Sequence, residues 1–127
     1  MEKIAEIHQD HLLIHSDIAF YNTEINFLKK LLSAQYADTT NHEEIRLLDN
    51  YWKEFDRIKE DLRMLDHKIN ANEYNFKQMY LQAVENIYEA YTEEERIVID
   101  FYSTREKLKL LKESFYSFMT ESRHRFV

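Results

Sequence analysis

The sequence predicts an all-α protein, an elongated antiparallel bundle of three long helices in a single domain spanning residues 1–127. The chain contains no glycine and no proline, whereas average usage of roughly 7% and 5% would give about nine and six. Apolar residues recur at alternating steps of three and four, the spacing of one helix face. The charged fraction of 32% exceeds the usual quarter, as expected for helices with an exposed face.

The first helix is predicted from residue 4 to about residue 35, a length of near 50 Å at 1.5 Å per residue. Its main stripe consists of Ile4, Ile7, His11, Ile14, Ile18, Tyr21, Ile25, Leu28, Leu32 and Gln35. A second stripe of Leu13, Phe20, Phe27 and Ala34 lies beside it. The two stripes widen the apolar face, so this helix is expected to contact at least two neighbours.

The second helix is predicted to begin near Asn41, after the polar segment 36–41. Thr40 followed three residues later by Glu43 fits a capping box. The stripe that follows is Ile45, Leu48, Trp52, Phe55, Ile58, Leu62, Leu65 and Ile69. Asn70 with Glu73 repeats the capping pattern, so the helix either continues to about residue 91 or breaks there. A break would create a fourth, shorter helical segment around residues 72–90.

The last helix is predicted to begin at Thr92, because Glu93, Glu94 and Glu95 would lie in its first turn, where the helix dipole favours acidic side chains. Its stripe is Ile97, Phe101, Thr104, Leu108, Leu111, Phe115, Phe118, Ser122 and Phe126. Short connections make sequential helices antiparallel neighbours. The sequence therefore predicts an up-down-up arrangement.

Charge and composition limit the classes of partner. The net charge of −7 and the pI near 5.4 disfavour nucleic acid and anionic membrane surfaces. No stretch approaches 18 apolar residues, and the amino-terminal segment carries acidic residues where a signal peptide has a basic and then an apolar run. A cytoplasmic location without a membrane partner is expected. The absence of cysteine excludes thiolate metal sites and thiol nucleophiles.

Three histidines of the first helix, at spacings of three and four, project from one side. If the chain reverses near Asp38, His11 lies level with Asp66 and His67 of the second helix. Imidazoles are common ligands of divalent metals, so the candidate metal ligands are His8, His11, His15, Asp66 and His67. One hypothesis is thus a metal-binding bundle that holds an ion such as Zn²⁺ or Fe²⁺. The other is that His11 is a partly buried histidine hydrogen-bonded to Asp66, with His8 and His15 solvated.

No pattern in the sequence indicates catalysis. A di-iron bundle needs two Glu-x-x-His pairs, and the chain has one, Glu121 to His124. Hydrolase nucleophiles sit in glycine-flanked turns that this chain lacks. Aromatic residues at helical spacing are typical of cores and interfaces. The tyrosines near the last connection, which could alternatively line a small-molecule pocket, are Tyr74, Tyr80, Tyr88, Tyr91 and Tyr102.

The segments Ile18–Leu28, Leu65–Asn70 and Phe115–Met119 together resemble a group of small, long-helix bacterial proteins of unknown function. These segments cover about a fifth of the chain. The resemblance implies an all-helical bundle and supplies no activity, cofactor or functional residue.

The wide apolar faces, the acidic surface and the missing catalytic patterns together favour a non-catalytic helical-bundle protein. Such a protein would act through self-association, as a homodimer, or through binding to a protein partner. No cofactor is expected under this hypothesis, and no catalytic residue is assigned.

Overall fold

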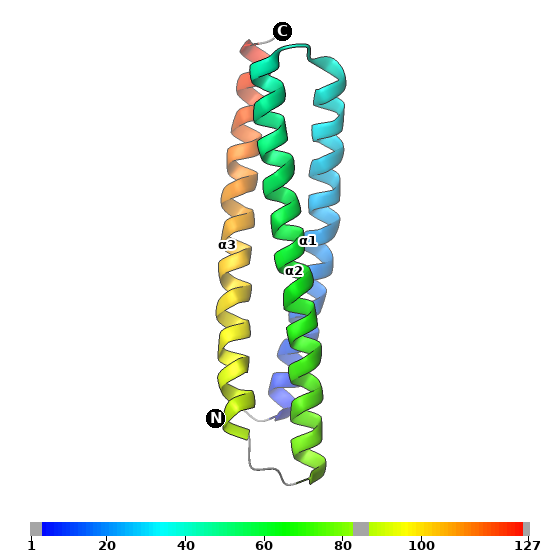
Figure 1. Cartoon of the computed structure of the whole chain (residues 1–127), viewed down its shortest axis with the longest axis vertical. Coiled ribbons are helices and arrows are strands. Elements are labelled where there is room, and N and C mark those ends of the chain that lie inside the picture. The colour runs from blue at the N-terminus through cyan, green and yellow to red at the C-terminus, as the bar shows by residue number, and fades with distance from the viewer. Residues whose placement is uncertain (1–3, 83–86, 126–127) are drawn as a thin grey trace.

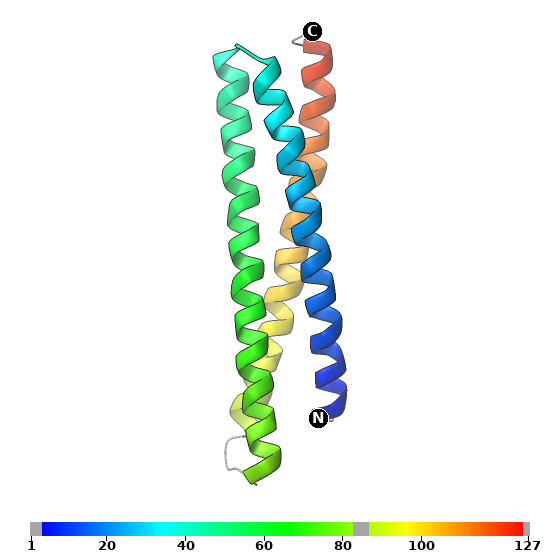
Figure 2. The same cartoon turned by 90° about the vertical axis from the view of Figure 1, so that its right-hand side faces the viewer.

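A computed structural model describes residues 4–82 and 87–125 of the chain. Three helices make up almost all of this part: α1 (Ile4–Asp38), α2 (His42–Gln82) and α3 (Ile87–Arg125). They lie side by side as one elongated bundle, in which α2 runs antiparallel to both neighbours (Figure 1). A second view shows α1 and α3 running in the same direction (Figure 2). The predicted three-helix, all-α bundle is confirmed.

A separate fourth segment is not present in the described residues. α2 continues through Asn70 to Gln82, and α3 begins at Ile87, so most of the segment predicted around residues 72–90 belongs to these two helices. Residues 83–86 lie outside the described part. The predicted start at Thr92 is also wrong, because the Thr92 hydroxyl donates to the Tyr88 carbonyl at 2.9 Å, one turn back in the same helix.

The start of α2 is capped by an asparagine. The Glu44 backbone N–H donates to Oδ1 of Asn41 at 2.9 Å, and the Asn41 N–H donates to the Thr39 hydroxyl at 3.1 Å. Asn41, rather than Thr40, is therefore the N-cap residue. The predicted start near Asn41 is confirmed, but the predicted Thr40 and Glu43 pair is not the capping pair.

The core runs along the centre of the bundle and receives side chains from all three helices. Its main cluster of buried residues is Ile14, Ile18, Ile25, Leu28, Leu32, Leu48, Phe55, Ile58, Leu62, Leu65, Ile69, Ile97, Phe101, Leu108 and Phe115. The rings of Phe55 and Phe115 meet edge to face, with centroids 5.6 Å apart. Tyr51 of α2 packs on Phe115 at 5.3 Å, and the predicted Trp52 beside it is also partly buried against this cluster.

The second stripe of α1 is not part of the core. Leu13, Phe20 and Phe27 are 65%, 63% and 55% exposed, and Ala34 is exposed as well. The main stripe is the one that faces α2 and α3. A three-helix bundle leaves the outer side of each helix to solvent, so the second stripe forms an exposed apolar row on α1.

The pairing of α1 with α2 differs from the predicted register. His11 contacts Glu73 rather than Asp66, and Asp66 instead accepts a hydrogen bond from His15 at 2.6 Å. α1 extends to Asp38, and the turn follows it at residues 39–41. In an antiparallel pair, moving the turn by one residue along the chain shifts the residue of α2 that faces a given residue of α1 by two.

No helix in residues 4–82 or 87–125 has both the length and the apolar character needed to cross a lipid bilayer.

Replacing Phe55 by alanine should lower the free energy of unfolding by about 3–5 kcal/mol, because a fully buried ring is lost and a cavity remains. Urea denaturation monitored by circular dichroism measures the change. Tyr80→Ala, which truncates an aromatic side chain that is 80% exposed, is the control and should change the value by less than about 0.5 kcal/mol. Equal effects of the two substitutions would contradict the core assignment.

Candidate functional site

Polar side chains from all three helices meet near the amino-terminal end of α1. We call this group the histidine network; its members are His8, His11, Asn72, Glu73 and Glu94. His11, Asn72 and Glu94 are buried, at 2%, 1% and 6% exposure. Ile7, Phe76 and Ala90 form a small apolar cluster beside them. The network therefore lies at one end of the main core and reaches the surface, where the side chains of His8 and Glu73 are 51% and 36% exposed.

His11 is held between two carboxylates. Its Nε2 lies 2.6 Å from Oε1 of Glu94, and its Nδ1 contacts Glu73. A neutral imidazole has a single N–H, so donation from both nitrogens requires the cationic ring. Burial opposes protonation, but the hydrogen bonds and charges of Glu94 and Glu73 outweigh it and raise the pKa of His11 above its usual 6.5.

Glu73 joins two histidines of α1. One of its carboxylate oxygens contacts Nδ1 of His8, and the other contacts Nδ1 of His11. Burial would raise the pKa of Glu73, but its bonds to His11 and His8 lower it below the usual 4.5. Glu73 is thus held as a carboxylate between the two rings.

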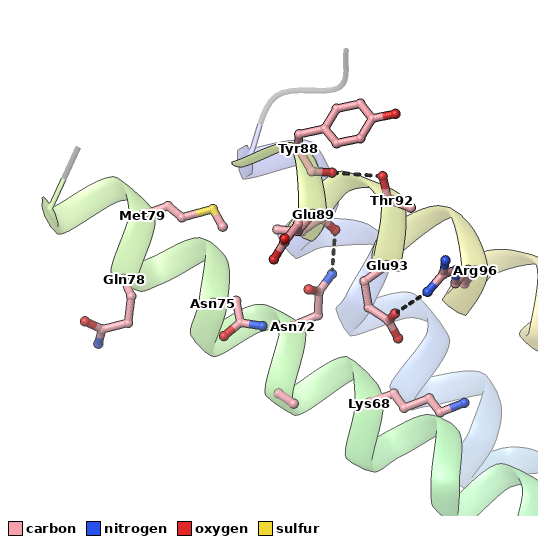
Figure 3. Close-up of a pocket in the computed structure, with 12 residues that line it drawn as sticks. Lys68, Asn72, Asn75, Gln78, Met79, Tyr88, Glu89, Thr92, Glu93 and Arg96 are labelled. Atoms are coloured by element: carbon pink, nitrogen blue, oxygen red, sulfur yellow. Dashed lines mark hydrogen bonds and ion pairs between the residues drawn. The ribbon is translucent and has the colours of Figure 1, made fainter. Parts of the chain in front are cut away.

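Asn72 connects α2 to the first turns of α3. Its amide nitrogen donates to the Ala90 carbonyl at 3.1 Å and to Oε1 of Glu94 at 3.2 Å. Within the described residues, its buried Oδ1 has no hydrogen bond partner. Asn72 also lines an open groove of about 760 Å³ between α2 and α3, together with Met79 and Tyr88 (Figure 3).

The tyrosines that could have lined a small-molecule pocket do not gather around this groove. Tyr88 is the one of the five that lines it. Tyr91 packs against Phe76 with ring centroids 5.2 Å apart, and Tyr74, Tyr80 and Tyr102 are exposed. The groove is instead bordered largely by amide and charged side chains: Lys68, Asn72, Asn75, Gln78, Glu89, Glu93 and Arg96.

The predicted metal ligands do not meet at one point. His8 and His11 share Glu73, whereas His15 pairs with Asp66, and His67 is exposed. Across residues 4–82 and 87–125, no three His, Cys, Asp or Glu side chains are placed to hold one metal ion. The two carboxylates on His11 lie at opposite ring nitrogens, so they cannot bind a single ion together with this ring. The metal-binding hypothesis therefore gains no support from the geometry.

Sequence reasoning missed three members of the network. The sequence alone predicts Glu94 in a first helical turn and Glu73 in a capping box, because local patterns fit those roles. Asn72 follows Leu65 and Ile69 at the regular core spacing. The available signal is a polar residue at a position where the alternating steps of three and four place a core side chain, as for Asn72.

A second buried polar cluster closes the opposite end of the core, around Glu44. Its carboxylate accepts hydrogen bonds from Gln35 at 2.6 Å, Thr39 at 2.8 Å and Ser122 at 2.7 Å. Burial would raise the pKa of Glu44, but these bonds lower it below 4.5. Gln35 belongs to α1, Glu44 to α2 and Ser122 to α3, so the hydrogen bonds of this cluster connect the three helices.

The exposed surface offers a different kind of site where α1 and α3 lie alongside each other. Four aromatic rings form a row across this seam: Phe20 meets Tyr21 at 6.0 Å, Tyr21 meets Phe101 at 6.4 Å, and Phe101 meets Tyr102 at 5.6 Å. We call the surface formed by the exposed members the α1–α3 face. Its residues are Leu13, Phe20 and Phe27 of α1 with Tyr102 and Tyr116 of α3, all of them about half exposed or more.

Comparison with known proteins adds no assignment: no protein-family model, curated protein or solved structure matches the chain.

Replacing Glu94 by alanine should lower the free energy of unfolding by about 3 kcal/mol, because His11 and Asn72 would both lose a buried acceptor. Urea denaturation at pH 6 measures this change. Glu106→Ala, which removes an exposed carboxylate of the same helix, should change the value by less than about 0.5 kcal/mol. A loss below 1 kcal/mol for Glu94→Ala would contradict the role given to the network.

Stability should also depend on pH in a defined direction. The raised pKa of His11 contributes stability that is complete below pH 6.5 and is lost as the pH rises through the folded-state value. The lowered pKa values of Glu73 and Glu44 contribute stability that is present above pH 4.5 and is lost as the pH falls through their folded-state values. The protein should therefore be most stable between about pH 4.5 and 6.5.

Denaturation curves from pH 4 to pH 9 test this profile. His11→Gln should remove most of the decline on the alkaline side. His67→Gln, which changes an exposed histidine, should preserve it. An alkaline decline that is unchanged in His11→Gln would assign the effect to another group.

Proposed function

We propose that the protein is a non-catalytic helical bundle that acts through association, either with a second copy of itself or with a protein partner. The observation that carries this proposal is the α1–α3 face. It places three large apolar side chains of one helix and two tyrosines of its neighbour on a single side of the molecule.

Exposing the apolar side chains of this row to water is unfavourable in free energy unless another surface covers the face. Scattered exposed hydrophobic residues are normal on folded proteins, whereas several large ones gathered on one side of a molecule favour an interaction site. Leu13, Phe20 and Phe27 recur every seven residues, which keeps them on one side of α1 over about 21 Å. Rigid aromatic side chains that are already ordered lose little conformational freedom on binding. The row is therefore suited to bind another helix surface.

The buried polar groups support a structural role for the rest of the molecule. His11 and Glu44 make hydrogen bonds to side chains of neighbouring helices. These hydrogen bonds hold the three helices together. The exposed surface is therefore the part of the molecule best suited to contact another molecule. The acidic net charge of −7 favours partners other than nucleic acid.

Replacing Phe20 by lysine should abolish self-association, because the charge would be buried at the centre of the apolar row. Size-exclusion chromatography with light scattering at protein concentrations up to several hundred micromolar measures the mass. The wild-type chain should give a mass above the 15.6 kDa of one chain, and Phe20→Lys should give the mass of one chain.

Tyr74→Lys is the matched control, because Tyr74 of α2 is 61% exposed and Phe20 is 63% exposed. This variant should associate as the wild type does. Circular dichroism melting of both variants verifies that the bundle is intact. A wild-type chain that is monomeric at every concentration would remove self-association from the proposal.

A further inference from the structure

We infer that the groove between α2 and α3 binds the primary ammonium group of an aliphatic amine, which donates hydrogen bonds to Oδ1 of Asn72 and to the carboxylate of Glu89. The groove is separate from the α1–α3 face, so this inference goes beyond the proposed function and does not depend on it. Three features of the groove support it: an acceptor without a donor, a carboxylate without a cation, and an apolar wall.

The orientation of the Asn72 amide is fixed by its neighbours. Its nitrogen donates to the Ala90 carbonyl at 3.1 Å and to Oε1 of Glu94 at 3.2 Å. Both partners are acceptors, so exchanging the nitrogen and the oxygen of the amide would place Oδ1 against two acceptors. The oxygen therefore points away from them, and Asn72 projects from α2 toward the groove that it lines (Figure 3).

Oδ1 of Asn72 has no donor. Asn72 is 1% exposed, and no group in residues 4–82 and 87–125 donates a hydrogen bond to this oxygen. A buried acceptor without a hydrogen bond is unfavourable in free energy, so a group that brings an N–H into the groove is stabilised there. Asn75 and Glu89, which also line the groove, are exposed, and their side chains can move aside to admit such a group.

The charges of the groove favour a cation as the donor. The charged side chains that line it are Lys68, Glu89, Glu93 and Arg96. Arg96 lies 3.8 Å from Glu93, and Lys68 lies 3.7 Å from Asp100, so each basic side chain already has an acidic partner. Within the described part of the chain, no basic side chain pairs with Glu89. The uncompensated charge of the groove is therefore negative.

Asn72 and Glu89 lie at one level of the groove, on facing helices, because Asn72 donates to Ala90, the residue after Glu89. An ammonium group carries three N–H donors, so a single nitrogen can serve both oxygens. Hydrogen bonds from a charged donor are stronger than those from a neutral one. The cationic ring of His11 does not oppose this binding, because its charge is balanced by its two carboxylate partners.

Apolar side chains provide a wall for the carbon chain of the amine. Ala71, Met79 and Ala90 line the groove, and Met79 and Ala90 belong to the small apolar cluster at this end of the bundle. The volume of about 760 Å³ lies within the range of roughly 300–1,000 Å³ that is usual for small-molecule sites. A short chain of methylene groups attached to the ammonium therefore fits beside Met79.

Two matched amines test the site. Butylamine has a primary ammonium group, whereas butyltrimethylammonium has the same charge and chain but no N–H. At pH 6, butylamine should shift the side-chain amide resonance of Asn72 in NMR spectra of the full chain, with a dissociation constant in the millimolar range. Butyltrimethylammonium should bind at least about 10-fold more weakly, because the charged hydrogen bonds are lost.

Glu89→Gln should raise the dissociation constant of butylamine about 3-fold, because an exposed ion pair is lost. Glu95→Gln is the matched control: it makes the same change at an exposed position of α3 outside the groove, and it should stay within about 2-fold. Asn72→Ala should abolish binding. Because this truncation also removes buried hydrogen bonds, circular dichroism melting checks its fold, and Glu89→Gln decides the test if Asn72→Ala does not fold.

The ammonium group could belong to a free polyamine or to a lysine side chain of another protein. Putrescine and a short peptide with one lysine among alanines distinguish these sources. Tighter binding of putrescine would assign the site to a free amine, and tighter binding of the peptide would assign it to a lysine side chain. Either result supports an ammonium site, and acetylation of the lysine should abolish binding of the peptide.

Two results would overturn the inference. If the Asn72 resonance does not shift with butylamine up to tens of millimolar, Oδ1 is satisfied by an ordered water alone. Equal dissociation constants for butylamine and butyltrimethylammonium would show attraction by charge without the hydrogen bonds. Neither result bears on the α1–α3 face, which is tested by the masses of the wild-type and Phe20→Lys chains.

Discussion

The alignment of the three helices depends on buried polar groups at the two ends of the core. Apolar stripes with a regular repeat can slide past one another by a heptad and still bury similar side chains, whereas a buried carboxylate must find its donors at one level. Glu44 finds Gln35, Thr39 and Ser122 in the observed alignment. At the other end Glu94 finds His11 and Asn72. Any other register would leave these groups buried without partners.

This alignment also determines which surface the molecule presents. With α2 packed against both other helices, α1 and α3 lie parallel and share a seam, bridged by Tyr21 and Phe101 and by the ion pair of Glu24 with Lys112. The exposed row of α1 then lies beside the tyrosines of α3. The same register that buries His11 thus assembles an aromatic surface from two segments about 80 residues apart in the sequence.

The sequence predicted elements better than contacts. The stripe from Ile7 to Leu32 is buried as expected, because a helix face is a local property that periodicity reports directly. The start of α3 was misplaced because Glu93 to Glu95 imitate a first turn, although Glu94 occupies a core position. The predicted partners of His11 were wrong because the position of one turn, in error by about two residues, moves every contact between α1 and α2.

What the sequence determined by itself is the form of the chain: a backbone without glycine or proline, with apolar residues at helical spacing, forms long rods that must pack side by side. What only the tertiary structure decided is that the second stripe of α1 stays exposed, and that His11 lies between Glu73 and Glu94. The contacts of His11 join residues more than 60 positions apart, and the exposure of the second stripe depends on how all three helices pack. Local spacing carries no information about such contacts, because each helix would have the same pattern in any register.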